Sequence, residues 1–144
     1  MAKILVSNCL LGCLCRYKGD GCPHEKVLAL AGEHTLIGVC PEQMGGLSTP
    51  RNPAEIVEDR VISCSGDDVT AQYRRGAETA LKLAELNGVD FAILKANSPS
   101  CGKGVVYDGT FSGGKREGNG VTVDLLLSKG IPVFTENESD QWPL

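Results

Sequence analysis

The sequence predicts a single α/β domain with a mostly parallel sheet, and three observations lead to this prediction. Short apolar runs alternate along the chain with segments of helical periodicity, an order typical of strands joined by crossover helices. The length of 144 residues is that of one ordinary domain, which can bury a core without a metal or a disulfide. No linker, repeat or low-complexity tract divides the chain, so we expect residues 1–144 to form one domain.

The first half of the chain contains two predicted strands, a helix and a hairpin. Residues 3–7 (KILVS) and 35–40 (TLIGVC) are apolar runs of strand length. Residues 25–32 (EKVLALAG), between them, look helical and end at a glycine suited to a helix C-terminus. In residues 55–63 (EIVEDRVIS) the apolar positions alternate around a turn-like EDR, which predicts a small hairpin or an edge addition to the sheet.

The second half contains the most regular helix of the chain. Apolar residues recur at helical spacing over residues 71–88, with Thr70 at the expected N-cap position and a closing glycine. Residues 89–96 (VDFAILKA) are almost continuously apolar, which predicts a strand buried on both faces. After a glycine-rich loop, residues 121–130 predict a helix and residues 131–136 a strand. The alternation predicts a Rossmann-like fold with helices on both faces of the sheet.

Charge and hydropathy argue against two classes of partner. The formal charge is −4, with acidic and basic residues interspersed, so we expect no broad positive face of the kind that binds duplex nucleic acid. No window approaches the roughly 20 apolar residues of a membrane span, and the start MAKILVSN has too short an apolar run for a signal peptide. We therefore expect a cytoplasmic protein.

The seven cysteines are the most informative feature of the composition. In a reducing compartment an odd and high count favours metal ligation or catalysis over disulfides. Three of them, Cys9, Cys40 and Cys101, lie at or just beyond the C-terminal ends of predicted parallel strands, where open α/β sheets bind ligands. We expect these thiols to converge on one site. Free cysteine also packs as a small hydrophobe, which is our expectation for Cys64, and we treat Cys22 as structural; both should lie elsewhere.

Three soft thiolates suit an iron–sulfur cluster, zinc or copper(I) rather than magnesium or calcium. Structural zinc is commonly held by C-x-x-C pairs, and the absence of this motif also argues against a thioredoxin-like redox role. A 4Fe-4S cluster on three cysteines leaves one iron without a protein ligand, the open position that Lewis-acid catalysis requires. Spacing alone does not choose between cluster and zinc.

A resemblance rests on five segments of the chain: SNCLLGCLCRYKGDG, GVCPEQMGGLSTPRNPAEI, LKANSPSCG, YDGTFSG and GNGVTVDLLLSKGIPVFTE. Together they are similar to the thiouracil desulfidase (TudS-like) family over nearly the whole chain. The resemblance implies a 4Fe-4S cluster on three cysteines, which by motif are Cys9, Cys40 and Cys101. It also implies non-redox removal of sulfur from thiolated pyrimidines, such as thiouracil, 4-thiouridine or its monophosphate, to give the oxo base and hydrogen sulfide.

Two residues next to these cysteines are candidates for catalysis. Glu42 lies on the same loop as Cys40 and could position or deprotonate the attacking water, or could simply cap the loop. Ser100, adjacent to Cys101, could donate to the ring or shuttle a proton, or its hydroxyl could only tie the Ser-Pro-Ser turn.

The candidates for substrate binding are Ser48, Arg51, Asn97 and Tyr107. Ser48 and Arg51 could cradle a uracil edge or a nucleotide phosphate, although Arg51 could instead pair with Glu55 to hold the loop. Asn97 flanks the end of the third strand. Tyr107 belongs to a glycine-rich segment that resembles a mobile cover, and it could stack on a base or serve only in packing.

Alternatives remain at the level of the site and of the function. We expect loops 45–53 and 104–120 to wall the site on opposite sides. Cys13 or Cys15 could add a fourth ligand, the commonest arrangement in electron-transfer clusters, and would then block substrate sulfur. Besides a desulfidase, the sequence is compatible with a zinc- or cluster-bearing binding or redox-sensing module without turnover, and with a nucleotide-binding α/β domain whose cysteines are merely packed.

Overall fold

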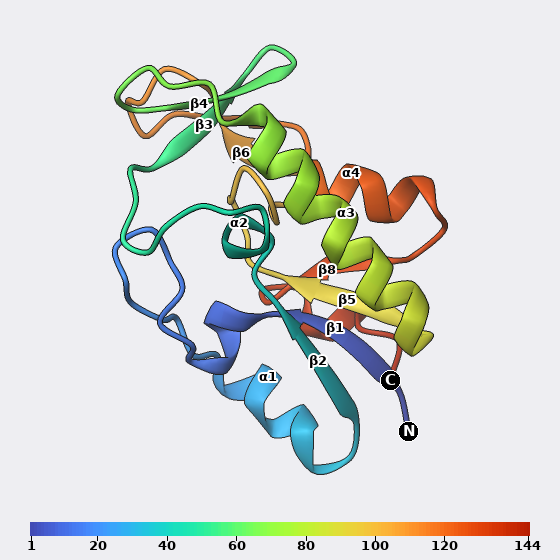
Figure 1. Cartoon of the computed structure of the whole chain (residues 1–144). Helices are drawn as coiled ribbons and strands as arrows, with labels where there is room; N and C mark the ends of the chain where they lie inside the picture. Colours follow the sequence, from blue (N-terminus) through green and yellow to red (C-terminus); the bar gives the residue numbers. More distant parts are fainter.

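The central feature of the fold is a four-stranded parallel sheet with the strand order β2-β1-β5-β8 (Figure 1). The computed structural model describes all residues from 1 to 144. The strands are β1 (Lys3–Ser7), β2 (Thr35–Val39), β5 (Phe91–Leu94) and β8 (Val133–Thr135), and every pairing among them is parallel. The predicted α/β class with a parallel sheet is confirmed.

The two central strands are buried on both faces of the sheet. In β1, Ile4 and Val6 belong to one core cluster, whereas Leu5 between them belongs to the other. Side chains of a strand point alternately to opposite faces, and all three are fully buried. The same alternation holds in β5, where Phe91 and Ala92 lie in different clusters. Both faces of the sheet must therefore be covered.

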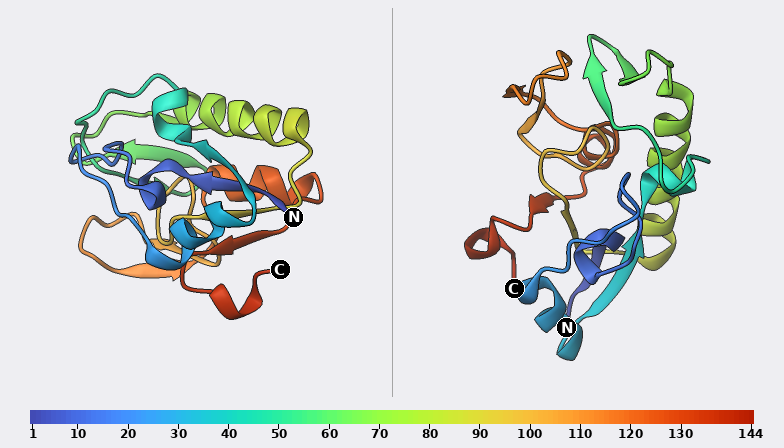
Figure 2. Two further views of the ribbon diagram at one scale, coloured as in Figure 1. Left: turned by 90° about the horizontal axis from the view of Figure 1, so that it is seen from below. Right: turned by 90° about the vertical axis from the view of Figure 1, so that its left-hand side faces the viewer.

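Helices provide this cover on the two sides. Two helices, α3 (Thr70–Asn87) and α4 (Val121–Ser128), pack on one face. The other face is covered by α1 (Glu25–Ala29) and by the C-terminal segment, which contributes Trp142 (Figure 2). The predicted helix 25–32 is thus shorter than expected, because its last turn is a 3-10 helix. This turn spans Leu30–Gly32, and two further 3-10 helices span Asn8–Leu11 and Ser139–Gln141.

None of the helices combines the length and the apolar character that crossing a lipid bilayer requires.

The ends of α3 differ in how well the sequence predicts them. Gly88 ends the helix in the left-handed conformation, with φ of 61°, as expected. The prediction of Thr70 as N-cap is wrong, because Val69 holds that position. The Asp68 carboxylate takes over the capping role and accepts hydrogen bonds from the Thr70 amide at 3.0 Å and the Thr70 hydroxyl at 2.6 Å. The Thr70 hydroxyl is buried and itself accepts from the Val61 amide at 2.8 Å, which ties the helix to the hairpin.

Two β-hairpins stand beyond the carboxyl ends of the sheet strands (Figures 1 and 2). The first, β3 (Ala54–Val57) with β4 (Arg60–Ser63), confirms the predicted hairpin. The second, β6 (Val105–Tyr107) with β7 (Lys115–Glu117), lies in the segment expected to be a loop. Its strands have three residues each, too few to show an alternating pattern in the sequence. Strand β3 contacts β6, so the hairpins lie side by side.

A single helical turn, α2 (Pro41–Met44), follows β2 and was not expected from the sequence. Pro41 occupies its first position, where the missing amide proton costs nothing. Helix α2 packs very closely on α3: a side chain at Gly45 would meet the carbonyl of Gln72, and one at Gly76 would meet the carbonyl of Pro41. These two glycines therefore permit direct backbone contact, which holds α2 at the carboxyl end of β2.

Candidate functional site

A cavity of about 430 Å³ opens at the carboxyl ends of β1 and β5. The chain runs from β1 to β2 on one side of β1, and β5 lies on its other side, so the strand order reverses between β1 and β5. Open α/β sheets bind their ligands at such a switch point. The volume lies within the ~300–1,000 Å³ typical of small-molecule sites. The loops after β1, β2 and β5 and both hairpins contribute to its wall.

All three cysteines predicted to form the site line this cavity. Cys9 lies in the 3-10 helix Asn8–Leu11 directly after β1, Cys40 joins β2 to α2, and Cys101 lies on the loop after β5. Cys9 and Cys101 are buried and Cys40 is half-buried. Because parallel strands end at the same edge of a sheet, three separate loops deliver their thiols to one place. The structure therefore brings together the three cysteines that the sequence singled out.

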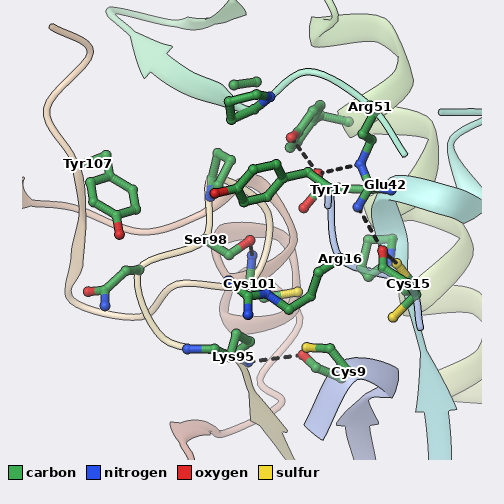
Figure 3. A pocket seen from close by; sticks show the side chains of 18 of the residues that line it. Cys9, Cys15, Arg16, Tyr17, Glu42, Arg51, Lys95, Ser98, Cys101 and Tyr107 are labelled. Carbon is green, nitrogen blue, oxygen red and sulfur yellow. Dashed lines mark hydrogen bonds and ion pairs between the residues drawn. The ribbon is translucent and has the colours of Figure 1, made fainter. Parts of the chain in front are cut away.

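A fourth thiol, Cys15, lies against this group (Figure 3). Cys15 is buried, and its thiol interacts with those of Cys40 and Cys9. The other candidate for a fourth ligand, Cys13, is exposed and does not line the cavity. Of the two candidates for an additional ligand, only Cys15 lies in the cavity.

Of the remaining two cysteines, Cys22 lies where we expected and Cys64 does not. Cys22 is half-buried and outside the cavity wall, as expected. The expectation for Cys64 is wrong: the residue is exposed and lines the cavity. Strand β4 ends at Ser63, so Cys64 lies in the turn beyond the strand, where no core covers it. The sequence pattern showed a strand nearby but not the residue at which it ends.

Burial and mutual contact raise the pKa of Cys15, Cys40 and Cys101 and keep these three thiols protonated in the metal-free protein. Burial raises the pKa of Cys101 to about 12. The interaction with Cys15, followed by burial, raises the pKa of Cys40. For Cys15, the interaction with Cys40 lowers the pKa, but contact with Cys9 and burial raise it more, to about 11. Metals bind thiolates, so loading the site with metal must release protons.

The donor set fits a soft metal group. Sulfur ligands select iron–sulfur clusters, zinc or copper(I). No three His, Cys, Asp or Glu side chains are arranged to hold a single metal ion. A cluster of several irons is larger than one ion, and its ligands come from different directions. Cys9, Cys40 and Cys101, on three loops around one cavity, have this kind of placement.

Glu42 lies in the first turn of α2 and lines the cavity, with 19% of its side chain exposed. Two donors reach the same carboxylate oxygen, Oε1: the Tyr73 hydroxyl at 2.7 Å and Arg51 Nε at 3.1 Å. Tyr73 belongs to α3 and is only 2% exposed. Sequence reasoning missed Tyr73, because it precedes no cysteine motif and is 31 residues from Glu42.

Arg51 lines the cavity but directs its donors into the protein. Nη1 donates to the Ser48 carbonyl at 3.2 Å and the Thr49 hydroxyl at 3.0 Å, and Nη2 donates to the Cys15 carbonyl at 2.9 Å. Its side chain is 7% exposed. The alternative expectation that Arg51 pairs with Glu55 is wrong, since its carboxylate partner is Glu42 (Figure 3).

Ser48 and Ser100 do not line the cavity. Ser48 is exposed and its hydroxyl donates to the Pro50 carbonyl at 3.0 Å. Ser100 is fully buried, and its hydroxyl shares a hydrogen bond of 2.8 Å with that of Thr122 in α4. The Ser100 hydroxyl thus joins the loop after β5 to a helix.

Ser98 is the serine of this loop that lines the cavity (Figure 3). Its hydroxyl oxygen accepts hydrogen bonds from the amides of Ser100 at 3.1 Å and Cys101 at 3.0 Å. A hydroxyl that accepts through its oxygen still has its own proton to donate.

The other two candidates for substrate binding, Asn97 and Tyr107, also line the cavity. Asn97 has a left-handed backbone, with φ of 68°, and forms a bridge with Val106 of β6. Tyr107 ends β6 and stands across the cavity from Arg51 (Figure 3). Segments 45–53 and 104–120 therefore lie on opposite sides of the site, as expected.

The tip of the second hairpin is fastened to the first. Glu55 Oε1 accepts hydrogen bonds from the amides of Gly109 at 3.0 Å and Phe111 at 3.2 Å. Phe111 lines the cavity, as Tyr107 does. The carboxylate that was expected to pair with Arg51 thus holds the cover of the cavity instead.

The cavity also has cationic side chains. Arg16 and Lys95 line it, together with the aromatic side chain of Tyr17 (Figure 3). Lys95 pairs with Glu136 at 3.0 Å and Arg16 with Asp20 at 3.5 Å. Sequence reasoning missed Arg16 and Tyr17, although they directly follow Cys15 in the segment that carries the family resemblance.

The fold and the cavity define an α/β protein with a thiol-rich, soft-metal site at the switch point of a parallel sheet, next to a carboxylate held by two donors. Comparison with known proteins identifies the family. The model of the 2-thiouracil desulfurase family matches residues 4–138, and the chain belongs to this family. The resemblance observed in the sequence is thereby confirmed.

Two individual proteins are similar over almost their entire lengths. YbbK, an uncharacterised protein of Bacillus subtilis (strain 168), is 47% identical, with 94% of this chain and 96% of that protein covered. A solved structure described as the 4Fe-4S-dependent thiouracil desulfidase TudS is 45% identical, with a TM-score of 0.93. The match covers 98% of this chain and 95% of the solved one.

Proposed function

We propose that the protein is an iron–sulfur-dependent desulfidase that removes sulfur from thiolated pyrimidines. Its substrates are thiouracil, 4-thiouridine or the monophosphate of 4-thiouridine, and its products are the oxo base and hydrogen sulfide. The observation that carries the proposal is the meeting of Cys9, Cys40 and Cys101 at one cavity. The 45% identity to a protein described as a 4Fe-4S-dependent thiouracil desulfidase supports it.

Cys9, Cys40 and Cys101 would hold a 4Fe-4S cluster. When bound on three cysteines, the cluster supplies an iron without a protein ligand, a soft Lewis acid suited to thiocarbonyl sulfur. The overall exchange of C=S and water for C=O and hydrogen sulfide balances without an oxidant or a reductant, so the proposed reaction is non-redox. A cluster on thiolates also fits the reducing cytoplasm, where we propose that the protein acts.

The remaining groups act on the water and on the ring. Glu42, at the cavity wall beside Cys40, accepts a proton from the water that attacks the ring carbon. We assign the hydroxyl donor to Ser98 rather than Ser100, because Ser98 faces the cavity and Ser100 bonds to α4. Asn97 and Tyr107 line the wall where a pyrimidine edge and face would lie.

Anaerobic purification with iron and sulfide analysis, followed by a sulfide-release assay, tests this function. The parent protein is expected to release sulfide from 2-thiouracil without an added electron donor or acceptor, and comparison of 4-thiouridine with its monophosphate ranks the substrates. Cys9→Ser, Cys40→Ser and Cys101→Ser should each abolish the broad visible absorbance of the cluster. Cys22→Ser is the matched control and should retain it, because Cys22 lies outside the cavity. An intact cluster without sulfide release from any of these substrates would instead indicate a binding or redox-sensing module.

A further inference from the structure

We propose that Tyr73 and Arg51 form a clamp on one oxygen of Glu42, and that this clamp aims the other oxygen at the attacking water. The inference rests on the proposed function, in which Glu42 is the base. It assigns Tyr73 and Arg51 as positioning residues, which act through Glu42 rather than on the substrate.

The clamp follows from where the two donors meet. The Tyr73 hydroxyl and Arg51 Nε both reach Oε1 of Glu42, at 2.7 and 3.1 Å. Oε2 makes no hydrogen bond within the chain. A carboxylate held by two donors at one oxygen cannot rotate without losing both bonds, one of them charge-assisted. Oε2 is therefore the oxygen available to a water in the cavity that Glu42 lines.

Tyr73 is a rigid donor. It lies near the start of α3, it is 2% exposed, and Gly76, close to one turn further on, brings the helix into backbone contact with Pro41. Pro41 directly precedes Glu42, so the backbones that carry the hydroxyl and the carboxylate are packed together. Burial, assisted by the charge of Glu42 and by the hydrogen bond to it, raises the pKa of Tyr73, so the hydroxyl keeps its proton.

Arg51 is anchored on the side away from Glu42. Its Nη1 and Nη2 donate to the segment 48–49 and to the Cys15 carbonyl, and its amide donates to the Tyr17 carbonyl at 2.8 Å. With its side chain 7% exposed, Arg51 has its donors occupied by the protein. This favours a role in holding Glu42 over the capture of a substrate phosphate, which needs free donors.

Fixing Glu42 should affect the chemical step more than substrate binding. A general base must lie within hydrogen-bonding reach of the proton that it removes. Misplacement of a catalytic group by about 1 Å can cost on the order of 100-fold in rate. A loose Glu42 would leave the thiol group and the ring-binding wall unchanged, so KM and cluster content should stay as they are while kcat falls.

Tyr73→Phe removes only the donor oxygen and is the direct test. In the cluster-loaded protein with 2-thiouracil as substrate, we expect kcat to fall by about 10- to 100-fold. KM, iron content and the spectral change on substrate binding should stay within about twofold of the parent values. A defect in folding would instead change KM or iron content together with kcat. Arg51→Lys keeps the charge but loses the fixed geometry of Nε and should show the same split between kcat and KM.

A double-mutant cycle shows whether Tyr73 acts through Glu42. In a Glu42→Gln background, adding Tyr73→Phe should lower the residual kcat by less than about twofold, because the group it positions is already gone. Thr70→Val is the matched control: it removes another buried hydroxyl from α3, outside the cavity wall, and should lower stability but leave kcat unchanged.

Three results would overturn the clamp. Tyr73→Phe turnover at the parent rate with an intact cluster would do so, as would an undiminished effect of Tyr73→Phe in the Glu42→Gln background. If Tyr73→Phe does not fold, parent-like kcat in Arg51→Lys has the same meaning. A different result would overturn the proposed function and the clamp with it: parent protein with an intact cluster that releases no sulfide from any of the thiolated substrates.

Discussion

Each cysteine has a local environment that determines its reactivity in the metal-free protein. Cys13 and Cys64 are exposed, whereas Cys9, Cys15 and Cys101 are buried. Alkylating reagents attack the thiolate, so reaction needs both access and ionisation. Burial and thiol contacts raise the pKa of Cys15 to about 11 and that of Cys101 to about 12, which leaves very little thiolate at neutral pH.

We therefore expect iodoacetamide to modify the metal-free protein in a fixed order. Under reducing, metal-free conditions near pH 7.5, Cys13 and Cys64 should react first, and Cys15 and Cys101 should react at least about 10-fold more slowly, since a pKa raised by one unit alone lowers the thiolate fraction tenfold. Peptide mass spectrometry over a time course measures the order. Equal rates after denaturation provide the control, and fast labelling of Cys101 in the folded protein would contradict its burial.

At the scale of elements, the contact between α2 and α3 places Glu42 and Cys40 beside the cavity. The contact depends on Gly76, where a side chain would collide with the Pro41 carbonyl. Gly76→Ala should therefore displace α2 and destabilise the protein by about 1–3 kcal/mol, the usual range for overpacking. It should also lower the iron content after cluster reconstitution, because Cys40 immediately precedes α2.

The comparison variant for Gly76→Ala is Gly32→Ala. A side chain at Gly32 would meet nothing within 4 Å, so this variant should match the parent in denaturant unfolding and in iron content. If Gly76→Ala also matches the parent in both, α2 is not held by close packing on α3.

The N-terminus of α3 should respond to acid through Asp68. Hydrogen bonds from the Thr70 hydroxyl and amide, followed by the bond from Arg60, lower the pKa of Asp68 to about 2. A carboxyl whose folded-state pKa lies below the unfolded value of 3.8 contributes stability that is present above pH 3.8 and is lost as the pH falls towards 2. We expect the difference in unfolding free energy between the parent and Asp68→Asn to shrink over this range.

Urea unfolding at pH 5, 4, 3 and 2, in matched ionic strength, measures this difference. Asp124→Asn, in the first turn of α4, serves as the comparison variant. A gap between parent and Asp68→Asn that stays constant down to pH 2 would mean that the carboxylate charge does not support the helix terminus.

At the scale of the whole molecule, the parallel sheet and the meeting of Cys9, Cys40 and Cys101 could be predicted because both depend on local patterns and on one topological rule. Apolar runs mark strands, and residues just after parallel strands meet at one edge. The partners of Glu42 could not be predicted in this way. Tyr73 lies 31 residues from Glu42 in the sequence, on helix α3. The two residues meet because glycines allow α2 and α3 to pack closely.

The failures at Cys64 and Thr70 share one cause. In both cases the sequence pattern indicated which element forms but not the residue at which it begins or ends. Cys64 is exposed because β4 ends one residue earlier, and Thr70 is not a cap because the helix begins at it. Short-range patterns determine where elements exist, whereas tertiary contacts determine where they end.

Cluster binding should stabilise the whole molecule, because the cysteines that hold the cluster follow three neighbouring strands of the sheet. Cys9 follows β1, Cys40 follows β2 and Cys101 follows β5, so a cluster held by all three would connect three separate loops. A group that binds the folded state alone raises its stability in proportion to the logarithm of its binding strength.

We expect removal of iron by a chelator under anaerobic conditions to lower Tm by several degrees, since about 1 kcal/mol shifts Tm by roughly 2–8 °C in domains of this size range. Hydrogen exchange should increase in the loops after these three strands and change least in β8 and α4. Cys22→Ser should show the same loss of Tm on iron removal as the parent, whereas Cys9→Ser should show none, because it starts without the cluster. Equal Tm values for loaded and stripped parent protein would mean that the metal group is not shared among the three loops.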